Sequence, residues 1–351
     1  MVTPTGGSPH GGIPPAAGRR GGWYDTGGRC TRVLLLWSAL LIASLAVLVR
    51  SAGAFISGAE EIGVRLGMPA FAVGVTIVSV GTTLPEMVAS VVAVTSGSPE
   101  IPLGNVVGSI VTNVFLVLGV AAVVGGRLHT TYEIVRVDLP LLVGSAFVLA
   151  IVAYDGSVTR PEALVCLVGS VIYVMYGIAM ARRREGLYER LEEEIEAEVG
   201  TGPLRARAFI LLGLSALGLY LGASYTVRSV VELAGILGIG SEIIALSVVA
   251  LGTSLPELTV AVLASRRGNL ELAIGNVLGA CILNAFAVVG VAGLVGPLAS
   301  AEAIRLFGLP MMLVAALLYF FMAEDREITR WEGWLLVLMY ALYVVKLFGW
   351  A

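Results

Sequence analysis

Ten long apolar blocks follow one another along the chain. They run over residues 33–64, 69–96, 101–125, 137–155, 160–181, 205–236, 240–265, 271–296, 301–322 and 331–349. A helix of about 20 apolar residues spans the hydrocarbon core of a bilayer and satisfies its own backbone hydrogen bonds there. Only 13% of the residues are charged, whereas soluble domains carry about 25%. The sequence therefore predicts an all-α integral membrane protein with ten transmembrane helices.

One polar segment precedes these blocks, and another lies between the fifth and the sixth. Residues 1–32 are rich in Gly, Pro and Arg, lack an apolar run, and are predicted to form a disordered N-terminal tail. Residues 182–204 contain a run of three arginines and a run of three glutamates, and are predicted to be a cytoplasmic linker. The linker separates two five-helix halves, residues 33–181 and 205–351.

The two halves contain an internal repeat with a constant offset of 171 residues. The matching segments are GTTLPE at residues 81–86 and GTSLPE at 252–257, GNVVG at 104–108 and GNVLG at 275–279, and Asn113 and Asn284. A fixed offset over this length indicates two copies of one structural unit. Gly and Pro fall inside apolar blocks at equivalent places, which is typical of the interrupted helices of secondary transporters.

Basic residues suggest how the halves are oriented. Arg266 and Arg267 follow the second block of the second half, whereas residues 96–99 at the matching place have no basic residue. Arg65 follows the first block of the first half, and residues 238–241 have none. Because Lys and Arg favour cytoplasmic loops, we expect inverted repeats with both termini outside. The arginines before the first block argue against this orientation.

Two glutamates, Glu86 and Glu257, lie near the middle of apolar blocks at equivalent places in the repeat. A charge at the bilayer centre costs about 3 kcal/mol or more, so the pair needs a shared compensation. A bound divalent cation would supply it. The alternative is a pair of protonated, hydrogen-bonded carboxyl groups without a transport role.

Oxygen donors surround both glutamates in the sequence. The hydroxyl residues within about one helical turn before them are Thr82, Thr83, Thr253 and Ser254. Pro85 and Pro256 lack an N–H, so the carbonyl groups four residues earlier lose their helical partners. Carboxylate, hydroxyl and carbonyl oxygens are the ligands that calcium prefers, in sets of about 6–8. Soft ligands for zinc or copper are missing from these segments.

The next block of each half has an asparagine 27 residues after the glutamate, Asn113 in the first half and Asn284 in the second. Ser109 lies four residues before Asn113, on the same helix face, and Ala280 takes the matching place before Asn284. These asparagines are candidate ion ligands, although a buried asparagine can also serve as a packing hydrogen bond. The Gly-Asn motifs before them are expected to permit close helix packing.

Together the twin motifs resemble the alpha repeats of the calcium/cation antiporter superfamily, specifically its prokaryotic sodium/calcium exchangers. The resemblance implies ten helices and four ion sites between the repeats, within residues 79–113 and 250–284. It implies this set of ligands for calcium and sodium: Glu86, Glu257, the hydroxyl groups of Thr82, Thr83, Ser109, Thr253 and Ser254, the carbonyl groups of Ser79 and Ala250, and the side chains of Asn113 and Asn284.

The sequence departs from that family pattern at three places. Thr83 replaces the usual serine and keeps the hydroxyl group, whereas Ala280 replaces a serine and removes one. Asn284 stands where some members have aspartate, which leaves two carboxylates at the site. Two carboxylates neutralise one calcium ion, but they hold fewer sodium ions firmly than a site that also has the aspartate. The divalent site is therefore better supported by the sequence than the sodium stoichiometry.

The resemblance implies a cell-membrane antiporter that exchanges calcium for sodium by alternating access, not an enzyme. No cofactor besides the transported ions and no nucleic-acid partner is expected, and the oligomeric state stays open. The alternatives are a proton/calcium or sodium/magnesium exchanger of the same superfamily, a cation channel and an intramembrane enzyme. The proton-coupled branch typically has Gly-Asn-x-x-Glu at the glutamates, and this chain has Leu-Pro-Glu there.

Overall fold

The computed structural model describes residues 26–66, 68, 70–129, 137–182, 206–236, 252, 254–323 and 326–348. Residues 1–25 of the predicted tail and residues 183–204 of the predicted linker lie outside the described residues. Two of the predicted site residues, Ala250 and Thr253, also lie outside them. Helix α1 begins at Thr26, seven residues before the first apolar block.

The helices follow the predicted order of apolar blocks. Those of the first half are α1 (Thr26–Arg65), α2 (Ala70–Val73), α3 (Ser79–Thr95), α4 (Ile101–Thr112), α5 (Gly119–Gly125), α6 (Asp138–Tyr154) and α7 (Arg160–Arg182). Those of the second half are α9 (Ala206–Ile236), α11 (Leu255–Arg266), α12 (Leu270–Leu283), α13 (Val289–Val295), α14 (Leu309–Met322) and α15 (Arg330–Phe348). Within the described ranges, six continuous helical stretches are long and apolar enough to cross a membrane.

Four π-helical segments interrupt these helices. They are η1 (Gly74–Val78) between α2 and α3, η2 (Asn113–Leu118) between α4 and α5, η3 (Asn284–Val288) between α12 and α13, and η4 (Ile304–Gly308) before α14. The repeat offset places η2 on η3, and each of these two begins at the asparagine that the sequence singles out. Such wide turns are rare and frequently lie at functional sites.

The helix break predicted around Pro85 is wrong in its position. Helix α3 continues through Pro85, and the departure from α-helical winding is η1, which ends immediately before Ser79. In the second half, Ser254 has φ −88° and ψ 6°, and α11 begins at Leu255 with Pro256 in its first turn. A proline is tolerated there because the first N–H groups of a helix have no helical partner.

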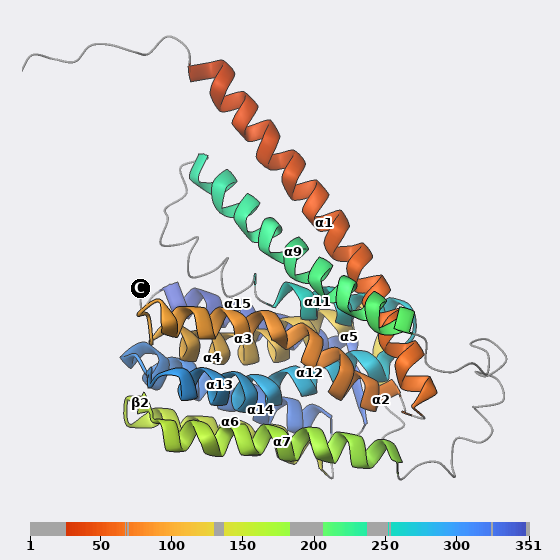
Figure 1. Cartoon of the computed structure of the whole chain (residues 1–351), viewed down its shortest axis with the longest axis vertical. Helices are drawn as coiled ribbons and strands as arrows, with labels where there is room; N and C mark the ends of the chain where they lie inside the picture. Colours follow the sequence, from red (N-terminus) through yellow and green to blue (C-terminus); the bar gives the residue numbers. More distant parts are fainter. Residues whose placement is uncertain are drawn as a thin grey trace, which may run out of the picture.

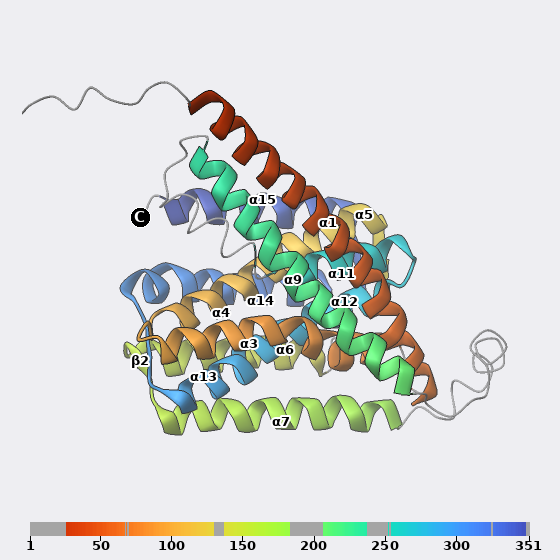
Figure 2. The same ribbon diagram turned by 45° about the horizontal axis from the view of Figure 1, so that its top comes forward.

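Two helices stand apart from the rest of the bundle. Helices α1 and α9 lie side by side along their lengths and lean away from the other helices, as both ribbon views show (Figures 1 and 2). Within an apolar stretch of 18 residues, 11% is buried in α1, whereas 83% is buried in the span 101–125 and 89% in the span 270–295. The last two spans, which contain Asn113 and Asn284, therefore form the centre of the bundle.

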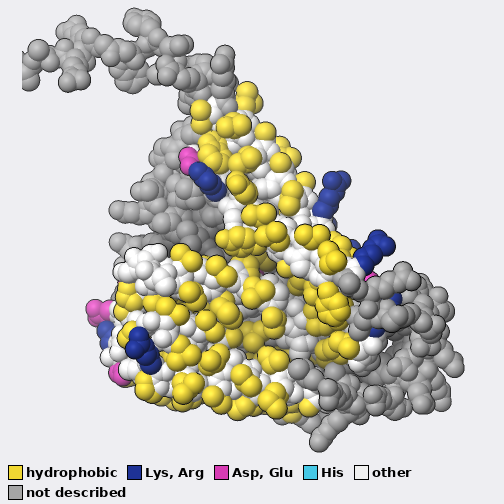
Figure 3. Space-filling model, in the orientation of Figure 1, with side chains coloured by type: hydrophobic (Ala, Val, Ile, Leu, Met, Phe, Trp, Pro, Cys, Tyr) yellow, Lys and Arg dark blue, Asp and Glu magenta, His cyan; other side chains and the backbone are white. Residues whose placement is uncertain are grey.

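The surface of the bundle is apolar. Hydrophobic side chains cover its visible face, and charged side chains lie toward its margins (Figure 3). Leu36, Ile42, Ile151 and Leu214 are among the large apolar side chains that are more than half exposed. A soluble monomer rarely exposes so extensive an apolar surface, and a bilayer would cover it.

Two short antiparallel strand pairs join the halves, and the sequence does not predict them. Strand β1 (Arg127–His129) pairs with β4 (Glu327–Thr329), and β2 (Ser157–Val158) pairs with β3 (Leu298–Ala299). The repeat offset relates β1 to β3 and β2 to β4, so each pair contains one strand from each half. The all-α prediction holds for the long spans, and the strands pair backbone groups in the connections between them.

Candidate ion-binding site

The two predicted glutamates come together from different halves. Glu86 lies within α3 and Glu257 lies in the first turn of α11, and both side chains are 0% exposed. Helix α3 packs against α11, and the two carboxylates interact electrostatically. None of their four oxygen atoms has a hydrogen-bond partner among the described residues. Two buried carboxylates without donors repel each other, so this arrangement requires a positive charge between them or bound protons.

Hydroxyl groups line the same region. Thr82, Thr83 and Ser254 are at most 2% exposed. The hydroxyl oxygens of Thr83 and Ser254 have no hydrogen-bond partner within the described part of the chain. Thr82 Oγ1 lies beside the carboxylate of Glu257, but without the geometry of a hydrogen bond. Buried polar atoms in native proteins are nearly always hydrogen-bonded or bound to an ion, so these oxygens are candidate ligands.

Ser79 and Thr82 connect the first glutamate motif to the second half. Thr82 Oγ1 lies 3.2 Å from Asn276 Oδ1 and 3.3 Å from the carbonyl oxygen of Ser79. The Ser79 hydroxyl donates to the carbonyl group of Val75, inside η1. The sequence predicts that Asn276 belongs to a packing motif, and the structure adds a hydrogen bond across the two halves. No local sequence signal distinguishes this role, because it depends on which helix lies opposite.

The asparagines of the two central spans complete the cluster. Asn113 and Asn284 are 0% exposed, and neither their amide oxygen nor their amide nitrogen has a hydrogen-bond partner among the residues the structure describes. Each begins a π-helical segment, which changes the direction of the side chains that follow. Ser109, one turn before Asn113 in α4, is also fully buried. Ala280 is buried at the equivalent place in α12 and brings no oxygen atom.

Glycines let the backbones approach at this centre, as the sequence predicts for the second half. A Cβ atom at Gly279 would lie 2.5 Å from both Ser79 Oγ and the carbonyl oxygen of Val75. A Cβ atom at Gly74 would lie 2.5 Å from the carbonyl oxygen of Leu272. Side chains at these places would separate α12 from η1, and thus separate the two halves of the site.

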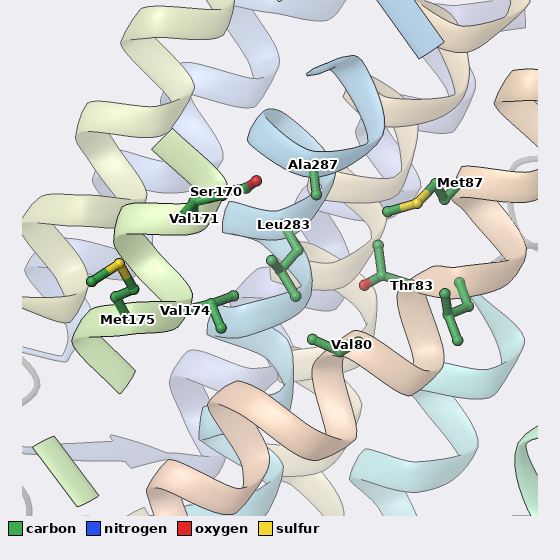
Figure 4. A pocket seen from close by; sticks show the side chains of 10 residues that line it. Val80, Thr83, Met87, Ser170, Val171, Val174, Met175, Leu283 and Ala287 are labelled. Atoms are coloured by element: carbon green, nitrogen blue, oxygen red, sulfur yellow. The ribbon is translucent and has the colours of Figure 1, made fainter. Parts of the chain in front are cut away.

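A cavity of about 280 Å³ adjoins the cluster on one side. It lies between α3, α7 and the α12–η3 span, and the hydroxyl groups of Thr83 and Ser170 face it among apolar side chains such as Met87 and Leu283 (Figure 4). Its walls are too apolar to hold a cation. The candidate binding site is therefore the polar cluster beyond Thr83.

The chemistry of the cluster suits a hard cation. Two carboxylates match the charge of a divalent ion, and hydroxyl and amide oxygens are ligands that calcium accepts in flexible geometry. Across the described residues, no group of three or more His, Cys, Asp and Glu side chains could hold a metal ion. The neutral oxygens of Thr, Ser and Asn would therefore have to supply the remaining ligands.

Comparison with known proteins identifies the family. The model of the family described as "Sodium/calcium exchanger protein" matches residues 36–179 and 207–349, one match in each half. The sodium/calcium exchanger MaX1 of Methanosarcina acetivorans is 31% identical, and the alignment covers 88% of this chain and 97% of that protein. The inner membrane protein YrbG of Escherichia coli is 32% identical, with coverage of 75% and 81%.

Solved structures share the fold. A structure of the sodium-calcium exchanger NCX_Mj soaked with sodium and calcium superposes with a TM-score of 0.74 at 25% identity, over 89% of this chain and 98% of that one. A second NCX_Mj structure, soaked with neither ion, gives a TM-score of 0.75. With both halves matched by the family model and the fold shared over most of its length, this chain is a cation antiporter, not an enzyme, and belongs to the sodium/calcium exchanger family.

Proposed function

We propose that the protein exchanges calcium for sodium across the cell membrane by alternating access. The observation that carries this proposal is the pair of Glu86 and Glu257, fully buried, contributed by the two halves, and without hydrogen-bond partners among the described residues. A bound calcium ion neutralises both charges, and sodium ions compete for the same oxygens. Because the two species share one set of carboxylates, they are exchanged and are not carried together.

The proposed ligand set consists of these carboxylates and the neutral oxygens near them. It contains the side chains of Glu86, Glu257, Thr82, Thr83, Thr253, Ser254, Ser109, Asn113 and Asn284, and the carbonyl groups of Ser79 and Ala250. The unpartnered oxygens of Ser254 and both asparagines support this assignment. The Thr83 hydroxyl faces the apolar cavity and would have to rotate toward the carboxylates to join the set. Ala280 removes one hydroxyl ligand, and Asn284 adds no charge. The two carboxylates balance two sodium ions, so a third sodium ion would leave the site with a net positive charge. We therefore expect this protein to hold fewer sodium ions firmly than a site with a third carboxylate.

The proposed orientation places the linker in the cytoplasm and both termini outside, with the two halves inverted. The strand pairs support a two-fold relation between the halves, because each joins repeat-related segments reciprocally. The separation of α1 and α9 from the bundle suits a pair of helices that slide across the site entrance. Location in the cell membrane follows the Escherichia coli relative, an inner membrane protein.

The alternative is a different pair of ions in the same fold. Proton/calcium and sodium/magnesium exchange need the same two carboxylates, and the human sodium/potassium/calcium exchanger 4 is 30% identical over 122 residues. Sodium is favoured because MaX1 and NCX_Mj, which align over nearly their whole length, are described as sodium/calcium exchangers. A channel is disfavoured, since the unpartnered carboxylates lie in a closed core.

Uptake of radioactive calcium into proteoliposomes tests the proposal. The vesicles are loaded with sodium, potassium or choline, with and without a pH gradient, and Glu86→Gln and Glu257→Gln are measured beside the native protein. We expect uptake only against internal sodium, lost in both variants. Glu100→Gln, at an exposed position before α4, is the matched control. Uptake driven by the pH gradient alone, or uptake that survives both substitutions, contradicts sodium/calcium exchange at this site.

A further inference from the structure

A second buried polar cluster lies outside the proposed ligand set. It consists of Asp138 at the start of α6, Tyr173 and Tyr176 in α7, Cys281 in α12 and Tyr319 in α14. Helix α6 packs against each of the other three helices; α6 and α7 lie at the bottom of the view in Figure 1, and α12 belongs to the centre of the bundle. Asp138, Cys281 and Tyr319 are 0% exposed, and Tyr173 is 2% exposed.

The Asp138 carboxylate is incompletely satisfied. Tyr176 donates one hydrogen bond of 3.3 Å to Asp138 Oδ2, whereas Oδ1 has no partner in the described part of the chain. The hydroxyl groups of Tyr173 in α7 and Tyr319 in α14 also have no hydrogen-bond partner there, and both helices pack against α6. Three buried oxygens without hydrogen-bond partners thus lie on α6 and on two helices that pack against it. Such an arrangement leaves a buried charge uncompensated unless an ion joins it.

The cluster has no equivalent in the other half of the protein. The repeat offset of 171 residues places Leu309 opposite Asp138, Val344 opposite Tyr173 and Leu347 opposite Tyr176. It likewise places Ile110 opposite Cys281 and Val148 opposite Tyr319. Every polar member therefore has an apolar counterpart, so the fold itself does not need polar groups here. Packing accounts for Leu309 and its neighbours, whereas it does not account for a buried carboxylate.

No ion pair of Asp138 with a basic side chain is found among the described residues. A single carboxylate balances a single positive charge, and tyrosine hydroxyl groups can act as oxygen ligands as well as donors. A divalent ion would keep a net positive charge and would find too few oxygens. We propose that Asp138, Tyr173 and Tyr319 form a binding site for one alkali-metal cation, with Tyr176 positioning the carboxylate.

Cys281 connects this site to the central one. It interacts electrostatically with Tyr173 and Tyr319 on one side and with Glu257 on the other. The auxiliary site therefore lies on the α6 side of α12, the helix that ends at Asn284 of the central site. It is separate from the ligand set proposed for transport, and the proposal that it binds a cation does not depend on which ions the central site exchanges.

Equilibrium binding of radioactive sodium and rubidium to the purified full-length protein tests the proposal. The central carboxylates are first neutralised together, as Glu86→Gln with Glu257→Gln, so that remaining binding belongs elsewhere. We expect one saturable site in this background, for sodium, rubidium or both. Adding Asp138→Asn should weaken it by about tenfold or more. Asp138→Leu, which copies the repeat-related Leu309, should remove the binding. This second variant still tests the site if the asparagine variant folds poorly.

Two control variants make the outcome specific. Asp155→Asn, an exposed carboxylate after the other end of α6, should leave the binding unchanged. Arg136→Gln tests the nearest basic residue in the sequence. Absence of saturable binding in the double-glutamine background, or binding that appears only with Arg136→Gln, overturns the proposal. The first result means that a proton neutralises Asp138, and the second means that an arginine does. Neither result bears on calcium uptake by the native protein, which tests the proposed exchange function separately.

Discussion

The two glutamate motifs have nearly the same sequence but different helical surroundings. Glu86 lies within α3, with about two turns of helix before it and more than two turns after it. Glu257 lies in the first turn of α11, and the residue before the helix, Ser254, is not helical. A negative charge in the first turn interacts favourably with the helix dipole, by about 0.3–1 kcal/mol, and a charge in mid-helix does not. The two glutamates proposed as ligands are therefore not energetically equivalent, and we expect Glu86 to depend more on a bound cation.

Neutralising each glutamate should show this inequality and produce the largest effects. Glu86→Gln and Glu257→Gln should each weaken calcium binding by about 100-fold or more, because each removes half of the neutralising charge. In calcium-free detergent, Glu86→Gln should raise the unfolding temperature more than Glu257→Gln does, since it removes the less compensated charge. Thermal unfolding with and without a chelator measures both effects. Equal shifts in the two calcium-free variants would show that the helix dipole does not distinguish the two positions.

Backbone contact at the centre of the site gives a second large effect. Gly279→Ala should destabilise the protein by about 1–3 kcal/mol, because the new methyl group would overlap Ser79 Oγ and the Val75 carbonyl group. Gly144→Ala in α6, where the methyl group meets no atom within 4 Å among the described residues, is the matched control and should be neutral or slightly stabilising. Denaturation in detergent measures the two changes. A Gly279→Ala protein as stable as the Gly144→Ala protein would mean that α12 and η1 are not held in contact.

The proposed sodium ligands of the second half can be tested by adding a hydroxyl group and a charge there. Ala280→Ser copies Ser109 of the first half, and Asn284→Asp adds a carboxylate at a fully buried position where both halves have asparagine. We expect sodium affinity to rise by about tenfold in the double variant, because a third carboxylate balances a further sodium ion. Equilibrium sodium binding measures the change, with Asn113→Asp as the repeat-related comparison. Unaltered sodium binding in all three variants would place the sodium sites away from η2 and η3.

The helices and both glutamates could be predicted from the sequence, because their signals are local. Apolar blocks give the spans, and residues 101–125 are recovered with the same limits. The constant offset of the repeat pairs Glu86 with Glu257. The π-helical turns at Asn113 and Asn284 could not be predicted, since a wide turn depends on how neighbouring helices pack. The hydrogen bond between Thr82 and Asn276, the strand pairs and the Asp138 cluster join segments far apart in sequence, and no periodicity specifies such contacts.

The smallest expected effect concerns the tether of α1 to the second half. Asn269 Nδ2 donates to Glu60 Oε1 at 2.7 Å, and Arg267 lies 3.3 Å from Ser57 Oγ, so the loop between α11 and α12 holds α1. The repeat equivalents of Arg267 and Asn269 are Ser96 and Ser98, whose short side chains cannot form the same contacts with α9. Alternating access by sliding helices requires this tether to break in each cycle.

Glu60→Ala should therefore change the maximum rate of calcium exchange by about two- to threefold while leaving calcium affinity unchanged, because a partly exposed hydrogen bond contributes about 1 kcal/mol. Glu61→Ala, at the next position of α1, removes a partly buried ion pair with Arg65 within the same helix and serves as the control. Its effect should be smaller, since an i,i+4 pair contributes about 0.3–0.5 kcal/mol and does not join α1 to the bundle. Rates of exchange at saturating calcium separate the two variants. An equal effect of both substitutions would show that the contact with Asn269 does not limit the movement of α1, and that this asymmetry between the halves has no part in transport.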